Sequence, residues 1–149
     1  AFARGASTIT QQLAKNLFLT DDRTIARKLS ETVLTWRLHA LLPKARVLEL
    51  YLNILELGPG IRGVAQATHT YFGKPAALLQ PIESAHLASL APNPRGFARR
   101  FREGRVDESW LIHLYDLLGS MKRTGRLTPA ELSAARASKL QLRSIVERS

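Results

Sequence analysis

The order of apolar and polar positions predicts a chain built from helices. One apolar stripe recurs at steps of three and four residues and is ended by Pro43; its members are Ile25, Leu29, Val33, Trp36 and Ala40. Asp21 and Asp22 stand before it, where an N-cap belongs. A second helix is predicted from Lys44 to Leu57, with Val47, Leu48, Tyr51, Leu52 and Leu55 on its buried side. Gly58-Pro59-Gly60 breaks the chain after it.

Helix signals continue to the C-terminal part. A short helix is predicted over 61–72, closed by Gly73, and another begins at Pro81 and stops before Pro92-Asn93-Pro94. Asp107 precedes an apolar helical face, and Thr128 to Glu131 has the form of a capping box. No stretch alternates convincingly with period two. We therefore expect a mostly α fold of about six or seven helices in a single domain, residues 1–149.

The stretch from Gly5 to Asn16 carries more polar groups than a packing helix needs. Helical spacing puts Gln11 and Lys15 on one face and Gln12 and Asn16 on the next. A glycine and hydroxyl residues before a helix suit its N-terminus, where free N–H groups and the dipole favour an anion. Two interpretations remain open: a solvent-exposed polar face behind an N-cap, or the wall of a polar ligand site.

Composition adds charge to this picture. The 149 residues are 45% hydrophobic, enough for one core, and no apolar run approaches a membrane span or resembles a signal peptide. Cysteine is absent, which excludes disulfides and thiolate metal sites. The net charge of +10 favours phosphate-bearing partners: nucleic acid, anionic lipid or a pyrophosphate.

The densest basic run is interleaved with two aromatic residues, Phe97 and Phe101; its cations are Arg95, Arg99, Arg100, Arg102 and Arg105. Such a run is commonly a solvated edge. The phenylalanines also allow a second interpretation, in which they stack on bases or enter a lipid headgroup layer.

Other polar residues are candidates for chemistry. Arg27 and Glu31, four apart, form either an exposed ion pair worth about 0.3–0.5 kcal/mol, or part of a polar cleft with Lys15 that binds a diphosphate. Arg62 follows the Gly-Pro-Gly break, a usual place for a functional cation. Asn53 suits a helix C-cap and Tyr51 an amphipathic core position.

The four histidines show no zinc-ligand spacing, and the sequence supports no Ser-His-Asp triad.

Taken together, these motifs resemble the peptidoglycan glycosyltransferases, the lysozyme-like family of monofunctional enzymes and of bifunctional penicillin-binding proteins. The matching segments stand in family order, and the likeness extends to about residue 130: Gly5 to Asn16, Arg27 to Glu31, Lys44 to Gly58, Arg62 to Lys74, and the helix from Pro81 with its Ala91 to Pro94 stop. The resemblance implies a lysozyme-like, mostly α domain.

Two departures from the family pattern matter. The family's first motif carries an acidic pair that supplies the general base. This motif and the family's membrane anchor should both precede Gly5, but this chain begins at Ala1. We therefore expect a fragment that is incomplete at the N-terminus. Thr35 and His39 stand where the family tends to have Ala and Glu.

The resemblance implies polymerisation of lipid II, with release of undecaprenyl pyrophosphate and inversion to a β-1,4 link. Lys15 and Arg27 would stabilise the leaving group, and Glu31 would be a catalytic carboxylate that orients the pyrophosphate or holds a divalent metal, Mg or Mn. Substrate contacts would come from Ser7, Thr8, Gln12, Asn16, Tyr51, Asn53 and Arg62. No organic cofactor is expected.

The implied partners are lipid II, the growing glycan chain and a membrane surface, with a transpeptidase domain or cell-wall synthesis proteins beside them, and no nucleic acid. The implied place is the extracytoplasmic or periplasmic face of the bacterial inner membrane. Two alternatives stay open: a non-catalytic binder of anionic lipid or pyrophosphate, motivated by the missing first motif, and a helical nucleic-acid binder, motivated by charge alone.

Overall fold

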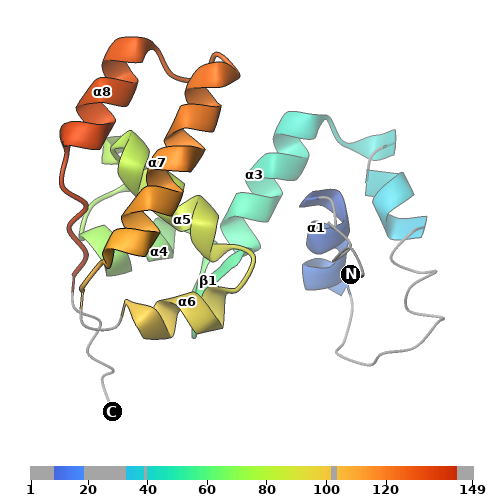
Figure 1. The fold of residues 1–149 in the computed structure, drawn as a ribbon. Coiled ribbons are helices and arrows are strands. Elements are labelled where there is room, and N and C mark those ends of the chain that lie inside the picture. Colours follow the sequence, from blue (N-terminus) through green and yellow to red (C-terminus); the bar gives the residue numbers. More distant parts are fainter. Residues whose placement is uncertain (1–8, 19–32, 39, 102–103, 144–149) are drawn as a thin grey trace, which may run out of the picture. The chain divides into compact units, whose positions relative to one another are not determined.

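The computed structural model describes residues 9–18, 33–38, 40–101 and 104–143, and within 14–18 and 98–100 it describes the backbone alone. The chain divides into two compact units, Ala1–Leu55 and Glu56–Ser149. The described residues of both units are mostly helical, which confirms the predicted fold class (Figure 1).

In the described part of the first unit, helix α1 (Ile9–Phe18) packs against helix α3 (Lys44–Ile54). Residues 33–38 and 40–41 are also helical. The buried row of α3 consists of Val47, Tyr51 and, just past its end, Leu55, while α1 contributes the fully buried Leu13. Residues 47, 51 and 55 are four apart, so they form one narrow row facing α1.

The predicted apolar faces of this unit are wider than the observed ones. Leu48 and Leu52 are 44% and 38% exposed, because the α1 contact uses a single row of α3. Val33 and Trp36 are 52% and 73% exposed, so this part of the predicted stripe is not buried. Asp21 and Asp22 lie outside the described residues.

Across residues 56–101 and 104–143, the second unit combines α-helices with a short hairpin. α5 packs against α7 and α8, α7 packs against α8, and α4 and α6 pack on β1 (Figure 1). In chain order its elements are β1 (Glu56–Gly58), β2 (Ile61–Arg62), α4 (Gly63–Phe72), a 3-10 turn (Ala76–Leu78), α5 (Pro81–Leu90), α6 (Pro94–Arg100), α7 (Glu108–Arg123) and α8 (Pro129–Ala137).

Several predicted helix ends are confirmed. Gly73 closes α4 in the left-handed conformation, with φ of 70°, and its N–H donates to the His69 carbonyl. The Asp107 carboxylate accepts from the Trp110 N–H at the start of α7. Thr128 and Glu131 form the capping box of α8, each side chain accepting from the other's backbone N–H.

Two elements differ from the prediction. The helix expected to reach Leu57 ends at Ile54, and residues 56–58 instead pair antiparallel with 61–62. These strands have three and two residues, too few to show a period-two pattern. Helix α6 begins at Pro94, inside the Pro-Asn-Pro stop, because proline ends one helix but also suits the first position of the next.

The core of the second unit contains a histidine enclosed by aromatic rings. His86 on α5 is fully buried, and its Nδ1 accepts a 3.0 Å hydrogen bond from Trp110 Nε1. Its ring lies 5.0 Å from Phe101 and 5.8 Å from Tyr71, centroid to centroid, in edge-to-face geometry. Nε2 therefore carries the proton of the neutral imidazole, and it has no partner among the described residues. Burial lowers the pKa of His86 from 6.5 to about 4.

This burial predicts that acid weakens the second unit. The folded state keeps His86 neutral, whereas the unfolded chain protonates it below its ordinary pKa. The free energy of unfolding should therefore fall between pH 6.5 and about pH 4. The loss attributable to His86 is about 3 kcal/mol at the acid end. Urea unfolding at pH 7, 5.5 and 4, followed by Trp110 fluorescence in a Trp36→Phe background, measures it.

The matched controls are His86→Phe, which removes the titrating group, and His69→Gln, which changes an exposed histidine. The first should flatten the pH dependence over this window, and the second should leave it unchanged. Equal pH dependence in the parent and the His86→Phe variant would contradict the role of His86.

Candidate active site

A polar contact joins the two helices of the first unit. The Tyr51 hydroxyl on α3 donates a 2.6 Å hydrogen bond to Gln12 Oε1 on α1. Tyr51 is 6% exposed and lies in the buried row of α3, while Gln12 is half-buried. Desolvation raises the pKa of Tyr51 above 10, so the phenol keeps its proton and acts as the donor at neutral pH.

This bond places the polar side chain of Gln12 on α1 against the buried Tyr51 of α3. Positions 15 and 16 are three and four residues after Gln12, and helical spacing places all three positions on neighbouring faces. Side-chain placement is described for Gln12 and not for Lys15 or Asn16. The predicted site residues Ser7, Thr8, Arg27 and Glu31 lie outside the described residues, as does His39.

Asn53 has a local bonding role. It lies in the last turn of α3, and its Nδ2 donates a 3.0 Å hydrogen bond to the Glu49 carbonyl one turn earlier. The helix C-cap is Leu55, whose N–H donates to the Tyr51 carbonyl, so the expected cap role of Asn53 is wrong. The Asn53 side chain remains exposed, and its amide oxygen faces no partner among the described residues.

Arg62 sits at the junction of β2 and α4 in the second unit. Its backbone N–H donates to Gln66 Oε1 at 2.9 Å, and Gln66 Nε2 reaches the Gly60 carbonyl at 3.4 Å. Gly60 and Gly63 adopt φ of 71° and 76°, which only glycine tolerates readily. One glutamine thus bridges the turn to the first turn of α4, and the Arg62 side chain is left exposed.

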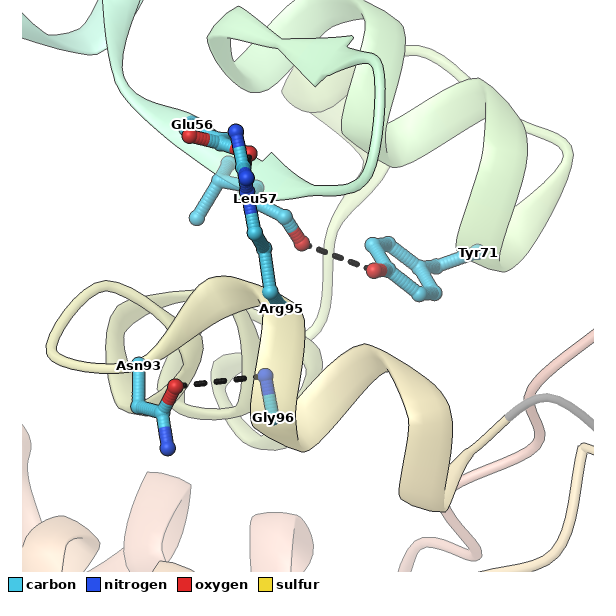
Figure 2. A network of polar contacts seen from close by, with 6 residues as sticks. All are labelled: Glu56, Leu57, Tyr71, Asn93, Arg95 and Gly96. Carbon is cyan, nitrogen blue, oxygen red and sulfur yellow. Dashed lines mark hydrogen bonds and ion pairs between the residues drawn. The ribbon is translucent and has the colours of Figure 1, made fainter.

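One buried contact and one surface contact hold strand β1 of the same hairpin (Figure 2). The Tyr71 hydroxyl donates a 2.7 Å hydrogen bond to the Leu57 carbonyl, and burial raises the pKa of Tyr71 to about 12. Arg95 on α6 bonds the Glu56 carboxylate at 2.9 Å. Tyr71 lies in the Arg62 to Lys74 segment, and its role could not be predicted because it depends on a hairpin that the sequence pattern does not reveal.

An apolar hollow of about 280 Å³ lies between α1 and α3. It is lined by Ile9, Thr10, Lys44, Val47 and Leu48. Lys44 and Thr10 were not proposed as site residues from the sequence. The sequence did offer one signal for Lys44: it is a cation directly after Pro43, at the first position of a helix.

The basic run does not present its aromatic residues to a ligand. Phe101 is fully buried, and Phe97 is half-buried with its ring centroid 4.9 Å from that of Trp110. Phe101 lies in the cluster around His86, so stacking on bases or insertion into headgroups is wrong for this residue. Phe97 packs on Trp110 of the same cluster. Helix α6 packs on α5 and β1, and Phe97 and Phe101 both pack on the Trp110 ring.

The Gln66 bridge predicts a measurable effect on the turn that carries Arg62. Gln66→Ala removes an acceptor from the Arg62 N–H and a donor from the Gly60 carbonyl, and should lower the free energy of unfolding by about 1 kcal/mol. Urea unfolding measures this change. Gln141→Ala, at an exposed glutamine outside the helices, is the control and should have no effect. Equal stabilities of the two variants would contradict the bridge.

Comparison with known proteins identifies a family. The family model described as transglycosylase matches residues 1–117. Among curated proteins, the "Biosynthetic peptidoglycan transglycosylase" of Nitrosomonas europaea is 52% identical over 99 residues, which cover 66% of this chain and 41% of that protein. Those of Nitrosomonas eutropha and an Azoarcus species are 54% and 50% identical, over 62% and 65% of this chain and 38% and 42% of theirs.

The chain thus spans about two fifths of the length of the curated relatives it matches. The family match includes every motif on which the resemblance was based up to the Ala91 to Pro94 stop, and with it α1, α3 and the hairpin that carries Arg62. Because the matched region covers well over half of its residues, the chain belongs to the transglycosylase family.

Proposed function

We propose that this chain carries the donor-site part of a peptidoglycan glycosyltransferase that polymerises lipid II. The observation that carries the proposal is the family match over residues 1–117, which contains the polar helix α1 and its bond to Tyr51. The curated relatives are named biosynthetic peptidoglycan transglycosylases. The net charge of +10 suits a substrate with a pyrophosphate.

In the proposed reaction, the 4-hydroxyl of the acceptor sugar attacks the anomeric carbon of the growing chain. The bond from that carbon to the pyrophosphate oxygen breaks, undecaprenyl pyrophosphate leaves, and the hydroxyl proton passes to a general base. Inversion gives a β-1,4 link. For the base, the resemblance implies a carboxylate of the family's first motif.

Cations near the leaving group would lower the barrier, because negative charge grows on the pyrophosphate as the bond breaks. We assign this role to Lys15 and Arg27, with Glu31 as the carboxylate that orients the site. Gln12 and Asn16 would donate hydrogen bonds from α1, together with Ser7 and Thr8 before it. Asn53 and Arg62 would contact the substrate from exposed positions.

A divalent metal at Glu31, Mg or Mn, stays a prediction. No group of three His, Asp or Glu side chains that could hold a metal occurs within the described ranges, and Glu31 lies outside them. No step above depends on a metal, and no organic cofactor enters the proposal.

A membrane surface is the proposed setting, on the extracytoplasmic side where peptidoglycan is made. The first unit exposes large apolar side chains, with Trp36 73% and Leu41 76% exposed, close in sequence to Arg37 and Lys44. Such a mixture suits an anionic leaflet. In the part of the chain that the structure describes, no helix has the length and hydropathy to cross a membrane. A transpeptidase domain or other cell-wall synthesis partners remain predictions.

The competing functions have less support. The nucleic-acid binder was motivated by charge, and the burial of Phe101 removes the stacking residue that would have favoured it. No observation specifically favours the non-catalytic binder.

The proposal predicts that Glu31→Gln and Lys15→Ala abolish polymerisation. Lys15→Ala removes a cation that stabilises the departing pyrophosphate, and Glu31→Gln removes the carboxylate that orients the site. A loss of at least about 100-fold in kcat is expected for each. The assay follows glycan chains formed from labelled lipid II by the natural full-length protein that contains this chain.

Glu49→Gln and Lys139→Ala provide matched controls, because both change exposed residues. Among the described residues, the ion-pair partner of Glu49 is Arg46 on the same helix. Both variants should polymerise lipid II like the parent. A parent protein that forms no glycan from lipid II would refute the function, while full activity of Glu31→Gln or Lys15→Ala would refute the site.

A further inference from the structure

Tyr51 and Gln12 are separated by 39 positions and lie on different helices, yet their side chains share a 2.6 Å hydrogen bond. The bond spans the contact between α1 and α3, where Leu13 is fully buried and Val47 is 5% exposed. Both helices thus pack around the two side chains. A change of rotamer in either side chain would break the short hydrogen bond.

We infer that Tyr51 is a positioning residue that orients the amide of Gln12, and that it does not itself contact the substrate. The inference rests on the proposed function, in which Gln12 donates to the sugar or pyrophosphate. It replaces the earlier assignment of Tyr51 as a substrate-binding residue.

The chemistry of a glutamine amide explains how this positioning works. An amide offers an acceptor oxygen and two N–H donors, and rotation of its terminal torsion exchanges their places at little cost. When Tyr51 occupies the oxygen of Gln12, the NH₂ group is held in the opposite direction. Within the described residues, Gln12 Nε2 has no hydrogen-bond partner. Two fixed donors match the oxygens of a pyrophosphate, which accept and never donate when ionised.

Burial makes a direct substrate role for Tyr51 unsuitable. Only 6% of the residue is exposed, and its single hydroxyl proton is already donated to Gln12. A second use of that proton would require breaking the bond to Gln12. The same burial keeps the phenol protonated, so the orientation it imposes persists through neutral pH.

A double-mutant cycle separates positioning from a general packing role. Tyr51→Phe removes only the hydroxyl and should lower kcat for lipid II polymerisation about fivefold in the parent protein. In a Gln12→Ala background the same substitution should have no further effect, because the residue through which it acts is gone. Gln12→Glu keeps the oxygen that accepts from Tyr51 but lacks the donors, and should lose at least as much activity as Gln12→Ala.

Two outcomes of the cycle would overturn the inference: unchanged activity of Tyr51→Phe, or an equal loss in both backgrounds. Tyr115→Phe is the matched control, since it removes an exposed tyrosine hydroxyl whose 3.4 Å contact is to the Arg136 carbonyl in the second unit. It should retain parental activity.

A second readout does not depend on turnover. In the 149-residue chain, ¹⁵N relaxation of the Gln12 side-chain amide should show restricted motion in the parent and in Tyr115→Phe, and a clear gain in motion in Tyr51→Phe. If the parent protein fails to polymerise lipid II, the proposed function falls while this measurement still decides the positioning role. An amide equally mobile in the parent and in Tyr51→Phe would overturn it.

Discussion

Among the described residues of the first unit, the hydrogen bond from Tyr51 to Gln12 links helix α3 to helix α1 across their packed contact. Of the described side chains of α1, Leu13 and Thr10 are buried and Ile9 is 45% exposed. The buried phenol of Tyr51, which donates to Gln12, adds a directional contact to this packing and constrains the rotation of α1 about its axis. The polar positions that follow Gln12 are oriented by this same constraint, which joins packing to the proposed chemistry.

The second unit uses the same device for a different purpose. The Tyr71 ring is buried beside His86. Its hydroxyl donates a hydrogen bond to the Leu57 carbonyl of β1, which links the strand to the core and satisfies that backbone acceptor (Figure 2). The Gln66 bridge secures the turn on the other side. A two-stranded hairpin is marginal by itself, and these bonds explain how a short one can present Arg62 at a defined place.

Local signals predicted much of this fold. Gly73, Asp107 and the capping box of Thr128 are recognisable because a cap is decided by neighbours within four residues. The hairpin was not predicted because its strands are too short to show a period-two pattern. The exposure of Trp36 and Leu48 escaped because periodicity shows that a face is apolar and not whether another element covers it.

The candidate site shows the same division. Gln12 and Tyr51 were each singled out from the sequence, but the bond between them joins positions 39 apart and could not be deduced from either motif. The family resemblance implies that Lys15, Arg27 and Glu31 act together at the pyrophosphate. Their side chains lie outside the described part of the structure. Conversely, Phe97 and Phe101 looked like surface residues in a basic run, and packing around His86 explains them instead.

We propose that this chain forms part of a site that breaks a sugar–pyrophosphate bond with inversion. The most direct measurement is NMR of the anomeric configuration of glycan made from ¹³C-labelled lipid II by the natural full-length protein, with undecaprenyl pyrophosphate quantified in the same reaction. We expect β-1,4 links and one undecaprenyl pyrophosphate released for each link formed. Retained configuration, or links formed without release of the pyrophosphate, would contradict it.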